Sequence, residues 1–332
     1  MKKLFTILAV AAAMVSCAKE EVVSFDQGEA IEFGNAFVDN ATRADQATDP
    51  SYSANDIESF QLYGTINNVL VYNDVTVEKG ENDYTEEWDC PVNQYWVAGV
   101  PHKFIAVVDG NVTAKDAYGM PTVLSYTADG ETDILCDDYS KTGNTDGTPN
   151  GIVAFTFNHL LSKAMFTVTN SSTQNDNNYI QVVRDITITN AYKSADYDVA
   201  AATWINPVAG LSQSFDDITI IKKDASEVCA NERLLIPGLE SVTVSFAIDL
   251  YYDLDNDGIA DGNEKVTTYD YTGEKAKTVA VAIEANKAYN FTIAVSVGEL
   301  ITFTVTEQPE WGNGNTHDSD DVDNVNDYIP LQ

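Results

Sequence analysis

Strict alternation of apolar and polar residues is the feature that most constrains the fold of this chain. Every even-numbered position from Val242 to Leu250 is apolar, and the same two-residue period recurs at 153–157, 289–297 and 301–305. A strand that buries one face produces this period, because successive side chains point to opposite faces of a sheet. No segment after the first sixteen residues keeps a helical period over three turns. The sequence therefore predicts an all-β fold built of β-sandwiches.

Turn-forming residues separate the predicted strands and suggest two blocks. Clusters of Asn, Asp and Gly occur at 143–151 and 175–178, and these residues favour turns. Around 204–214 the chain carries Pro and Gly and loses its alternation, so we place the boundary between the two domains there. The predicted organisation is one β-sandwich at 44–205 and a second at 206–332, which ends in an acidic tail.

The N-terminus has the pattern of a secretory signal peptide. Two lysines precede a mostly apolar run at 4–15, which is too short to span a bilayer as a helix. Ser16 and Cys17 resemble the end of a bacterial lipobox, in which the cysteine receives a lipid. We therefore expect a signal peptide at 1–16 and lipidation of Cys17. The alternative is an ordinary signal peptide with a chance cysteine.

The residues directly after the cysteine bear on localisation. Lys19, Glu20 and Glu21 resemble the signal that sends some lipoproteins to the outer face of the outer membrane. The alternative is a polar tether without such a signal. We expect a surface-exposed lipoprotein of the cell outer membrane.

Composition excludes several classes of function. The chain has 52 acidic and 18 basic residues and a formal net charge of −34, which repels phosphate backbones. Nucleic acid is therefore not an expected partner. A hydrophobic content of 44% nevertheless indicates a folded chain with its charges on the solvent faces. The three histidines stand in no catalytic motif, so we do not predict an enzyme.

Residues 253–264 fit the twelve-residue pattern of a calcium loop. Position 6 is Gly258, and position 7, which offers a backbone carbonyl, is Ile259. Carboxylates occupy positions 1, 3, 5, 9 and 12, namely Asp253, Asp255, Asp257, Asp261 and Glu264. Oxygen ligands at this spacing suit Ca²⁺. The flanking segments 243–252 and 265–271 look like strands instead of the helices of an EF-hand, and a solvated hairpin loop is the alternative. No cofactor is expected to be required, and Ca²⁺ is the one candidate.

Short blocks spread over nearly the whole mature chain resemble the fimbrillins, lipoprotein pilus subunits of Gram-negative gut and oral anaerobes. One of these blocks reads Phe-Thr-Phe-Asn-His-Leu-Leu-Ser-Lys at 155–163. The others, in order, are 30–34, 41–44, 94–96, 103–108, 132–135, 234–237, 287–291 and 305–311. The resemblance implies two transthyretin-like β-sandwich domains in tandem.

The resemblance also implies a processing mechanism. Residues 17–43 would be a lipidated prosegment whose first strand, around 23–33, fills a groove in the N-terminal domain until an Arg-specific protease removes it. The removal would expose unpaired backbone groups and an apolar slot, and a strand of another subunit would fill both. The expected partners are therefore other pilin subunits, the protease and, before processing, the outer membrane through the lipid.

Arg43 is the residue at which we expect the cut. It is the only basic residue between Lys19 and Lys79, and it stands in a polar, small-residue stretch at 40–55 that suits an exposed loop. The protease would cut the bond between Arg43 and Ala44. The alternative is an ordinary solvated arginine.

Two segments are candidates for the donated strand. Residues 300–306 alternate well, and the tail after Trp311 is free but poorly patterned. If neither can be donated, the subunit would be a pilus tip instead of a stalk unit. The function expected from the resemblance is a fimbrial subunit that polymerises by donor-strand exchange and serves adhesion.

A monomeric glycan-binding lipoprotein of the outer membrane is the alternative function. Trp88, Tyr95, Trp96 and Trp204 could supply an aromatic platform for a sugar. Core packing is the competing interpretation, and we favour it for Tyr95 and Trp96. A hydrolase is the third class, because carboxylates are too abundant in this sequence to exclude a catalytic pair.

Overall fold

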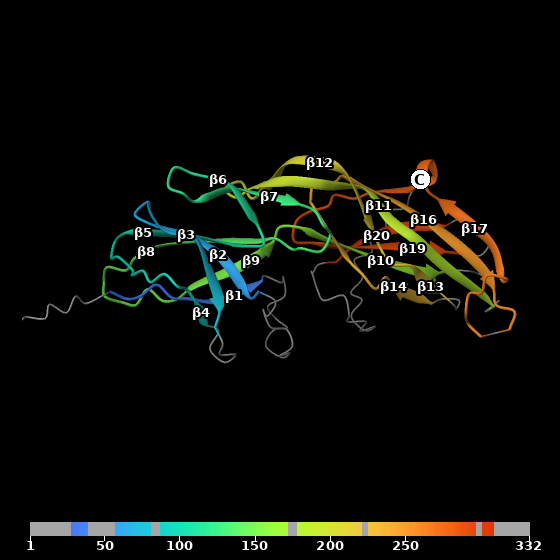
Figure 1. The fold of residues 1–332 in the computed structure, drawn as a ribbon, viewed down its shortest axis with the longest axis horizontal. Helices are drawn as coiled ribbons and strands as arrows, with labels where there is room; N and C mark the ends of the chain where they lie inside the picture. The colour runs from blue at the N-terminus through green and yellow to red at the C-terminus, as the bar shows by residue number, and fades with distance from the viewer. Residues whose placement is uncertain are drawn as a thin grey trace, which may run out of the picture.

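The computed structural model describes residues 28–38, 57–80, 87–171, 178–220, 225–255, 257–296 and 301–308. These residues form twenty strands and one 3₁₀ helix, Gly273–Lys275. The predicted all-β class is confirmed. The molecule is elongated, with the earlier strands in one half and the later strands in the other (Figure 1). None of the described residues belongs to a helix long and apolar enough to cross a membrane.

Seven strands of the first half form a sheet that closes on itself. In their order around the sheet they are β1 (Phe33–Val38), β4 (Glu87–Asp89), β3 (Val69–Lys79), β2 (Ser59–Ile66), β5 (Pro101–Val108), β8 (Leu135–Thr142) and β9 (Val153–His159). All of these pairs are antiparallel except β1 with β9, which is parallel. The interior is rich in aromatic side chains, including Phe60, Phe104, Phe155 and Phe157. The alternation at 153–157 therefore places alternate side chains of β9 inside the closed sheet.

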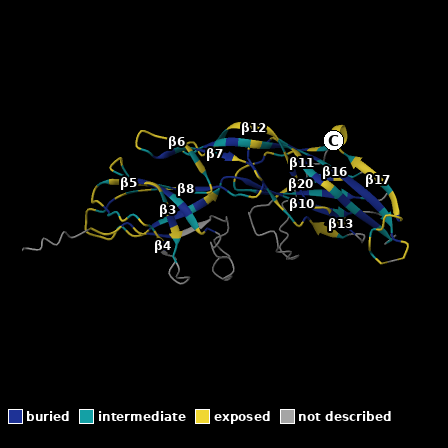
Figure 2. Cartoon of the chain, in the orientation of Figure 1, coloured by how far each residue is buried: buried dark blue, intermediate teal, exposed yellow. Residues whose placement is uncertain are grey.

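The second half is a sandwich of two sheets, and the larger sheet continues over the closed sheet of the first half (Figure 1). The smaller sheet contains β10 (Ser162–Asn170), β14 (Ser226–Val228), β15 (Arg233–Leu235), β19 (Ala288–Val295) and β20 (Thr302–Gln308). The larger sheet contains β6 (Asn111–Lys115), β7 (Pro121–Thr127), β11 (Tyr179–Asp198), β12 (Thr203–Ser214), β13 (Ile218–Ile220), β16 (Ser241–Tyr252), β17 (Lys265–Tyr271) and β18 (Lys277–Ala280). Buried side chains from both sheets, such as Phe166, Phe246 and Phe291, share one core. Buried residues lie along the strands, and exposed residues lie in many of the turns between them (Figure 2).

Strand β11 connects the two halves. Its first part pairs with β16 and its last part pairs with β7, which lies over the closed sheet. A separate apolar cluster lies at this junction and includes Val107, Leu161, Tyr197 and Ile236. The closed sheet and the sandwich are therefore joined by both backbone pairing and side-chain packing.

The domain boundary predicted between residues 205 and 206 lies inside β12. This strand pairs with β11 from Thr203 to Ser214, with four shifts of register on the way. Asn206 and Gly210 adopt positive φ at these irregularities, and β11 is the only described strand that β12 contacts through backbone pairing. Bulges and proline are tolerated on such an edge strand, because no second ladder of hydrogen bonds is lost. The last strand of the closed sheet is β9, and every described strand from β10 onward belongs to one of the two sandwich sheets.

Candidate functional site: the first strand and its groove

The segment from Glu29 to Val38 closes the first sheet. The amide of Trp96 donates to the carbonyl of Glu29 at 2.9 Å, and the amide of Ile31 donates to the carbonyl of Gln94 at 2.8 Å. From Phe33 onward, β1 pairs with β4 on one edge and with β9 on the other. The groove for this segment is therefore the space between β4 and β9.

Two side chains of this segment fill the interior of the closed sheet. Ile31 and Phe33 are 6% and 4% exposed. The ring of Phe33 lies 5.7 to 6.3 Å, centroid to centroid, from three core rings, those of Tyr72, Phe104 and Phe155. Burial of each of these two side chains stabilises the fold by about 1.5–3 kcal/mol. The groove is therefore apolar and aromatic, and it is completed by the segment that occupies it.

Glu29 fastens the start of the segment to the loop before β9. Its Oε2 accepts hydrogen bonds from the backbone and side-chain amides of Asn150, at 2.6 and 2.8 Å, and its Oε1 accepts one from the amide of Gly151 at 2.9 Å. The backbone hydrogen bond from Asn150 is the main cause that lowers the pKa of Glu29 below its ordinary value. The ionised carboxylate is thus the form that holds this end of the segment in place.

The observed strand lies later in the sequence than the expected one. We expected a strand around 23–33, whereas β1 begins at Phe33, and the residues before Gly28 lie outside the described part of the chain. Ile31 and Phe33 are two positions apart, as on one face of a strand, and could have indicated this segment. No sequence signal points to the contact of Glu29 with Asn150, because it joins two loops far apart in the chain.

The residues expected to carry processing are not part of this site as described. The predicted signal peptide, Cys17, Arg43 and Ala44 all lie outside the described residues. Arg43 follows the end of β1 closely in the sequence, so a cut there would separate β1 from the rest of the chain. Lipidation and cleavage at these positions stay predictions.

One of the two candidate donor segments belongs to the sandwich itself. Strand β20 covers most of 300–306 and pairs with β19 along its whole length, from Thr302 to Gln308. Phe303 and Val305 are 1% and 6% exposed and lie in the sandwich core. The other candidate, the tail after Trp311, lies outside the described residues.

The predicted calcium loop connects β16 to β17, and its flanking segments are strands, as expected. Carboxylate oxygens of Asp253, Asp255 and Asp257 lie within 4.8 Å of one another. Ile259 is exposed, and its amide donates a hydrogen bond to Asp257 Oδ1 at 2.8 Å. Near the end of the loop, the amide of Glu264 donates to the carbonyl of Asp261 at 2.9 Å.

The four aromatic residues of the alternative function do not form a surface platform. Trp88 and Trp96 are 8% and 6% exposed and belong to the core of the closed sheet. Trp204 donates its indole N–H to the carbonyl of Leu160 at 2.7 Å and packs at the junction of the two halves. Tyr95 is half-buried. Core packing, which we favoured for Trp96, is its observed role.

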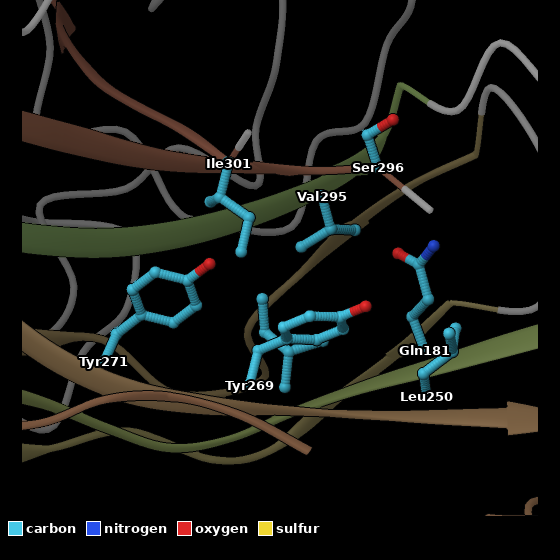
Figure 3. A pocket seen from close by; sticks show the side chains of 8 residues that line it. Gln181, Leu250, Tyr269, Tyr271, Val295, Ser296 and Ile301 are labelled. Atoms are coloured by element: carbon cyan, nitrogen blue, oxygen red, sulfur yellow. The ribbon is translucent and has the colours of Figure 1, made fainter. Parts of the chain in front are cut away.

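A small pocket opens at the edge of the sandwich, where the two sheets separate (Figure 3). Its empty volume is about 320 Å³, including space open to solvent. Tyr269 and Tyr271 face Val295 and Ile301 across it, and the buried Oε1 of Gln181 has no hydrogen-bond partner. Because most of the lining is apolar or aromatic, the pocket is a place where the core reaches the surface and not a cluster of convergent polar groups.

The described histidines do not resemble catalytic groups. His102 is fully buried, with Nδ1 donating to the carbonyl of Val100 at 2.9 Å and Nε2 accepting from the amide of Val97 at 3.2 Å. Burial lowers the pKa of His102, so the ring stays neutral with both nitrogens bound to backbone. His159, the last residue of β9, contacts the carboxylate of Asp133 through Nδ1.

Comparisons with known proteins give the family and the fold that this chain resembles. A family model described as fimbrillin-like matches residues 42–309. The chain resembles the crystal structure of a fimbrial protein from Bacteroides vulgatus, with a TM-score of 0.60 and 12% identity over 85% of this chain and 99% of that one. It is also similar to the fimbrial anchor protein Mfa2 from Porphyromonas gingivalis, with a TM-score of 0.38 and 10% identity over 85% of this chain and 97% of that one. No curated protein sequence matches this chain.

Proposed function

This chain belongs to the fimbrillin-like family, and on that premise we propose that it is a fimbrial subunit that assembles by donor-strand exchange. In this exchange, a strand of another subunit replaces the first strand, β1. The observation that carries the proposal is the position of β1. It lies between β4 and β9 and is the strand that closes the sheet. Its neighbours meet only through it, so its loss would open the closed sheet. The proposed role is structural and needs no catalysis.

The steps of assembly follow from the order of residues along the chain. Lipid on Cys17 would carry the subunit to the outer membrane and its surface. Cleavage after Arg43 would then release residues 17–43, and β1 with them. The two strands beside β1 would be left with unpaired backbone groups, which is costly in water. The interior would lose Ile31 and Phe33, and a strand of another subunit would restore both the pairing and the packing.

The proposed donor is the tail after Trp311. Strand β20 is a poor donor, because its departure would uncover Phe303 and Val305 in the sandwich core. The tail contains Val322, Val325, Ile329 and Leu331, although these do not alternate cleanly. Insertion of the tail of one subunit into the groove of the next is a head-to-tail contact, which propagates as a filament instead of closing.

Arg-specific cleavage of the purified precursor tests this proposal. We expect a new N-terminus at Ala44 and filaments in electron micrographs only after cleavage. Arg43→Lys is the matched variant, because it keeps the charge but removes the side chain that such a protease recognises. It should remain uncut at this bond and should form no filaments.

Two outcomes would contradict the proposal. One is resistance of Arg43 with cutting at other bonds, and the other is equal filament formation by cut and uncut protein. A protein that stays monomeric after cleavage and is retarded in gels containing polysaccharide would support the glycan-binding alternative.

A further inference from the structure

A buried carboxylate without its full set of partners lies at the base of the loop between β16 and β17. Glu264, the last residue of the twelve-residue pattern, is 9% exposed. Its Oε1 accepts a hydrogen bond from the amide of Leu254 at 2.7 Å, so the carboxylate lies against the start of the loop. Its Oε2 is buried and has no hydrogen-bond partner. A buried carboxylate oxygen without a partner is unfavourable, and a bound cation would supply the missing partner.

Three further carboxylates of the same loop gather beside Leu254 without a compensating positive charge. One oxygen each from Asp253, Asp255 and Asp257 lies within 4.8 Å of the others. Within the described part of the chain, no lysine or arginine forms an ion pair with any of the three. Lys265, the nearest base in sequence, is instead bound to Asp249 at 2.8 Å. Their mutual repulsion is relieved by a cation among them.

We propose that residues 253–264 bind one calcium ion through the three aspartates, the carbonyl of Ile259 and the carboxylate of Glu264. This set consists only of oxygen ligands, which a hard cation prefers to the nitrogen and sulfur ligands of transition metals. Asp261, at the ninth position, acts through water, as that position often does in such loops. The site is separate from the groove that β1 occupies, because it lies in the other half of the molecule (Figure 1).

The ion fastens three strands at this end of the sandwich. The amide of Asp253 donates to the carbonyl of Asn178, just before β11, at 2.7 Å. The amide of Tyr252, the last residue of β16, donates to the carbonyl of Glu264 at 2.9 Å, and β17 begins at the next residue. A cation held by both Asp253 and Glu264 therefore ties the ends of β16 and β17 to the start of β11. Loops of this type in extracellular modules bind Ca²⁺ with a Kd on the order of 10⁻⁴–10⁻³ M.

Calorimetric titration of the purified full chain with calcium chloride tests the site directly. We expect one ion per chain for the native protein and at least a tenfold weaker Kd for Glu264→Gln. Asp270→Asn is the matched control, because it removes one carboxylate charge from β17 outside the loop, and its Kd should equal that of the native protein. The absence of calcium binding to the native protein, or an unchanged Kd in Glu264→Gln, would overturn the proposal.

Thermal unfolding separates a ligand role for Glu264 from a purely structural one. Calcium should raise the Tm of the native protein and leave that of Glu264→Gln nearly unchanged, and in a chelator the variant should be no less stable than the native protein. A variant that is equally destabilised with and without calcium would contradict the proposal. If Glu264→Gln does not fold, Asp255→Asn provides the same test, because Asp255 is exposed; an unchanged Kd in that variant would also overturn it.

Discussion

The two halves of the molecule complete their cores with strands from opposite ends of the described chain. In the closed sheet, β1 lies between two neighbours, and its partner β9 is far away in the sequence. In the sandwich, β20 pairs along one edge with β19 and with no other described strand. Each strand nevertheless buries an aromatic side chain, Phe33 in β1 and Phe303 in β20.

The two strands differ in the sheet edges that their removal would expose. Loss of β1 would expose the edges of both β4 and β9 and open the closed sheet, whereas loss of β20 would expose one edge of β19. Unpaired edges are templates for pairing with another chain. The closed sheet without β1 is therefore the better acceptor of a foreign strand, and the sandwich is complete by itself.

Replacement of the buried ring in β1 should have the largest effect on this contrast. Phe33→Ala removes a side chain that contacts Tyr72, Phe104 and Phe155, and it should lower the free energy of unfolding by about 3–5 kcal/mol. Urea unfolding measures this loss. After cleavage at Arg43, the same variant should release its N-terminal segment faster than the native protein, which size-exclusion chromatography can follow.

Phe303→Ala is the matched control in the other half. Phe303 is 1% exposed and packs near Phe291, with ring centroids 6.1 Å apart, so a loss of similar size, about 3–5 kcal/mol, is expected. The release of the cleaved segment should stay at the native rate, because Phe303 lies in the sandwich core. Equal acceleration by both substitutions would mean that the two cores are not separate in the way we describe.

A buried carboxylate holds the larger sheet of the sandwich together, and its loss should have an intermediate effect. Asp249 is 4% exposed and binds Arg184 Nε at 2.9 Å, Lys265 Nζ at 2.8 Å and the Thr268 hydroxyl at 2.7 Å. Asp249→Asn should lower the free energy of unfolding by roughly 1–3 kcal/mol, because charged groups lose their partner. Leu62, in the closed sheet, should keep its native amide exchange in this variant.

The same carboxylate gives the sandwich a pH dependence. Burial raises the pKa of Asp249, but hydrogen bonds from Arg184, Lys265 and Thr268 outweigh it and hold the pKa at about 2. The native carboxylate therefore stabilises the fold fully above the ordinary aspartate pKa, near 3.8, and loses this contribution as the pH falls to about 2. Urea unfolding between pH 5 and pH 2 should show a smaller acid loss in Asp249→Asn. Identical pH profiles would contradict this assignment.

Local patterns in the sequence were sufficient to predict the fold class and the resemblance to the fimbrillins. The alternation at 242–250 corresponds to β16, and the resemblance of the ordered blocks to fimbrillins is confirmed by the family match. These features are local, since each depends on a few neighbouring residues. The strands beside the predicted calcium loop could be read for the same reason.

Features that depend on distant contacts could not be read from the sequence. Pro207 and Gly210 have the composition of a linker, yet pairing with β11 keeps them in an edge strand. The unpaired oxygen of Glu264 is a consequence of burial in the folded hairpin. The start of β1 at Phe33 depends on β4 and β9, which come much later in the chain.

The smallest expected effect concerns the contact that holds the start of the first strand. Glu29→Gln keeps one side-chain oxygen and loses the charge that strengthens the hydrogen bonds from Asn150 and Gly151. Because Glu29 is exposed, global stability should change little, whereas the cleaved segment should leave several-fold faster. Glu32→Gln is the control, since Glu32 is a nearby exposed carboxylate, and it should release at the native rate.

The rate at which the cleaved segment is released should depend on pH, and the lowered pKa of Glu29 gives the direction of this dependence. The pKa of Glu29 is lowered, chiefly by the backbone hydrogen bond from Asn150, so its contribution is present above the ordinary glutamate pKa and is lost as the pH falls through the lowered value. The cleaved native protein should therefore release its segment faster in acid, and Glu29→Gln should lack this acceleration. If both proteins respond to acid alike, the contact does not retain the strand, and Ile31 and Phe33 alone account for its retention in the groove.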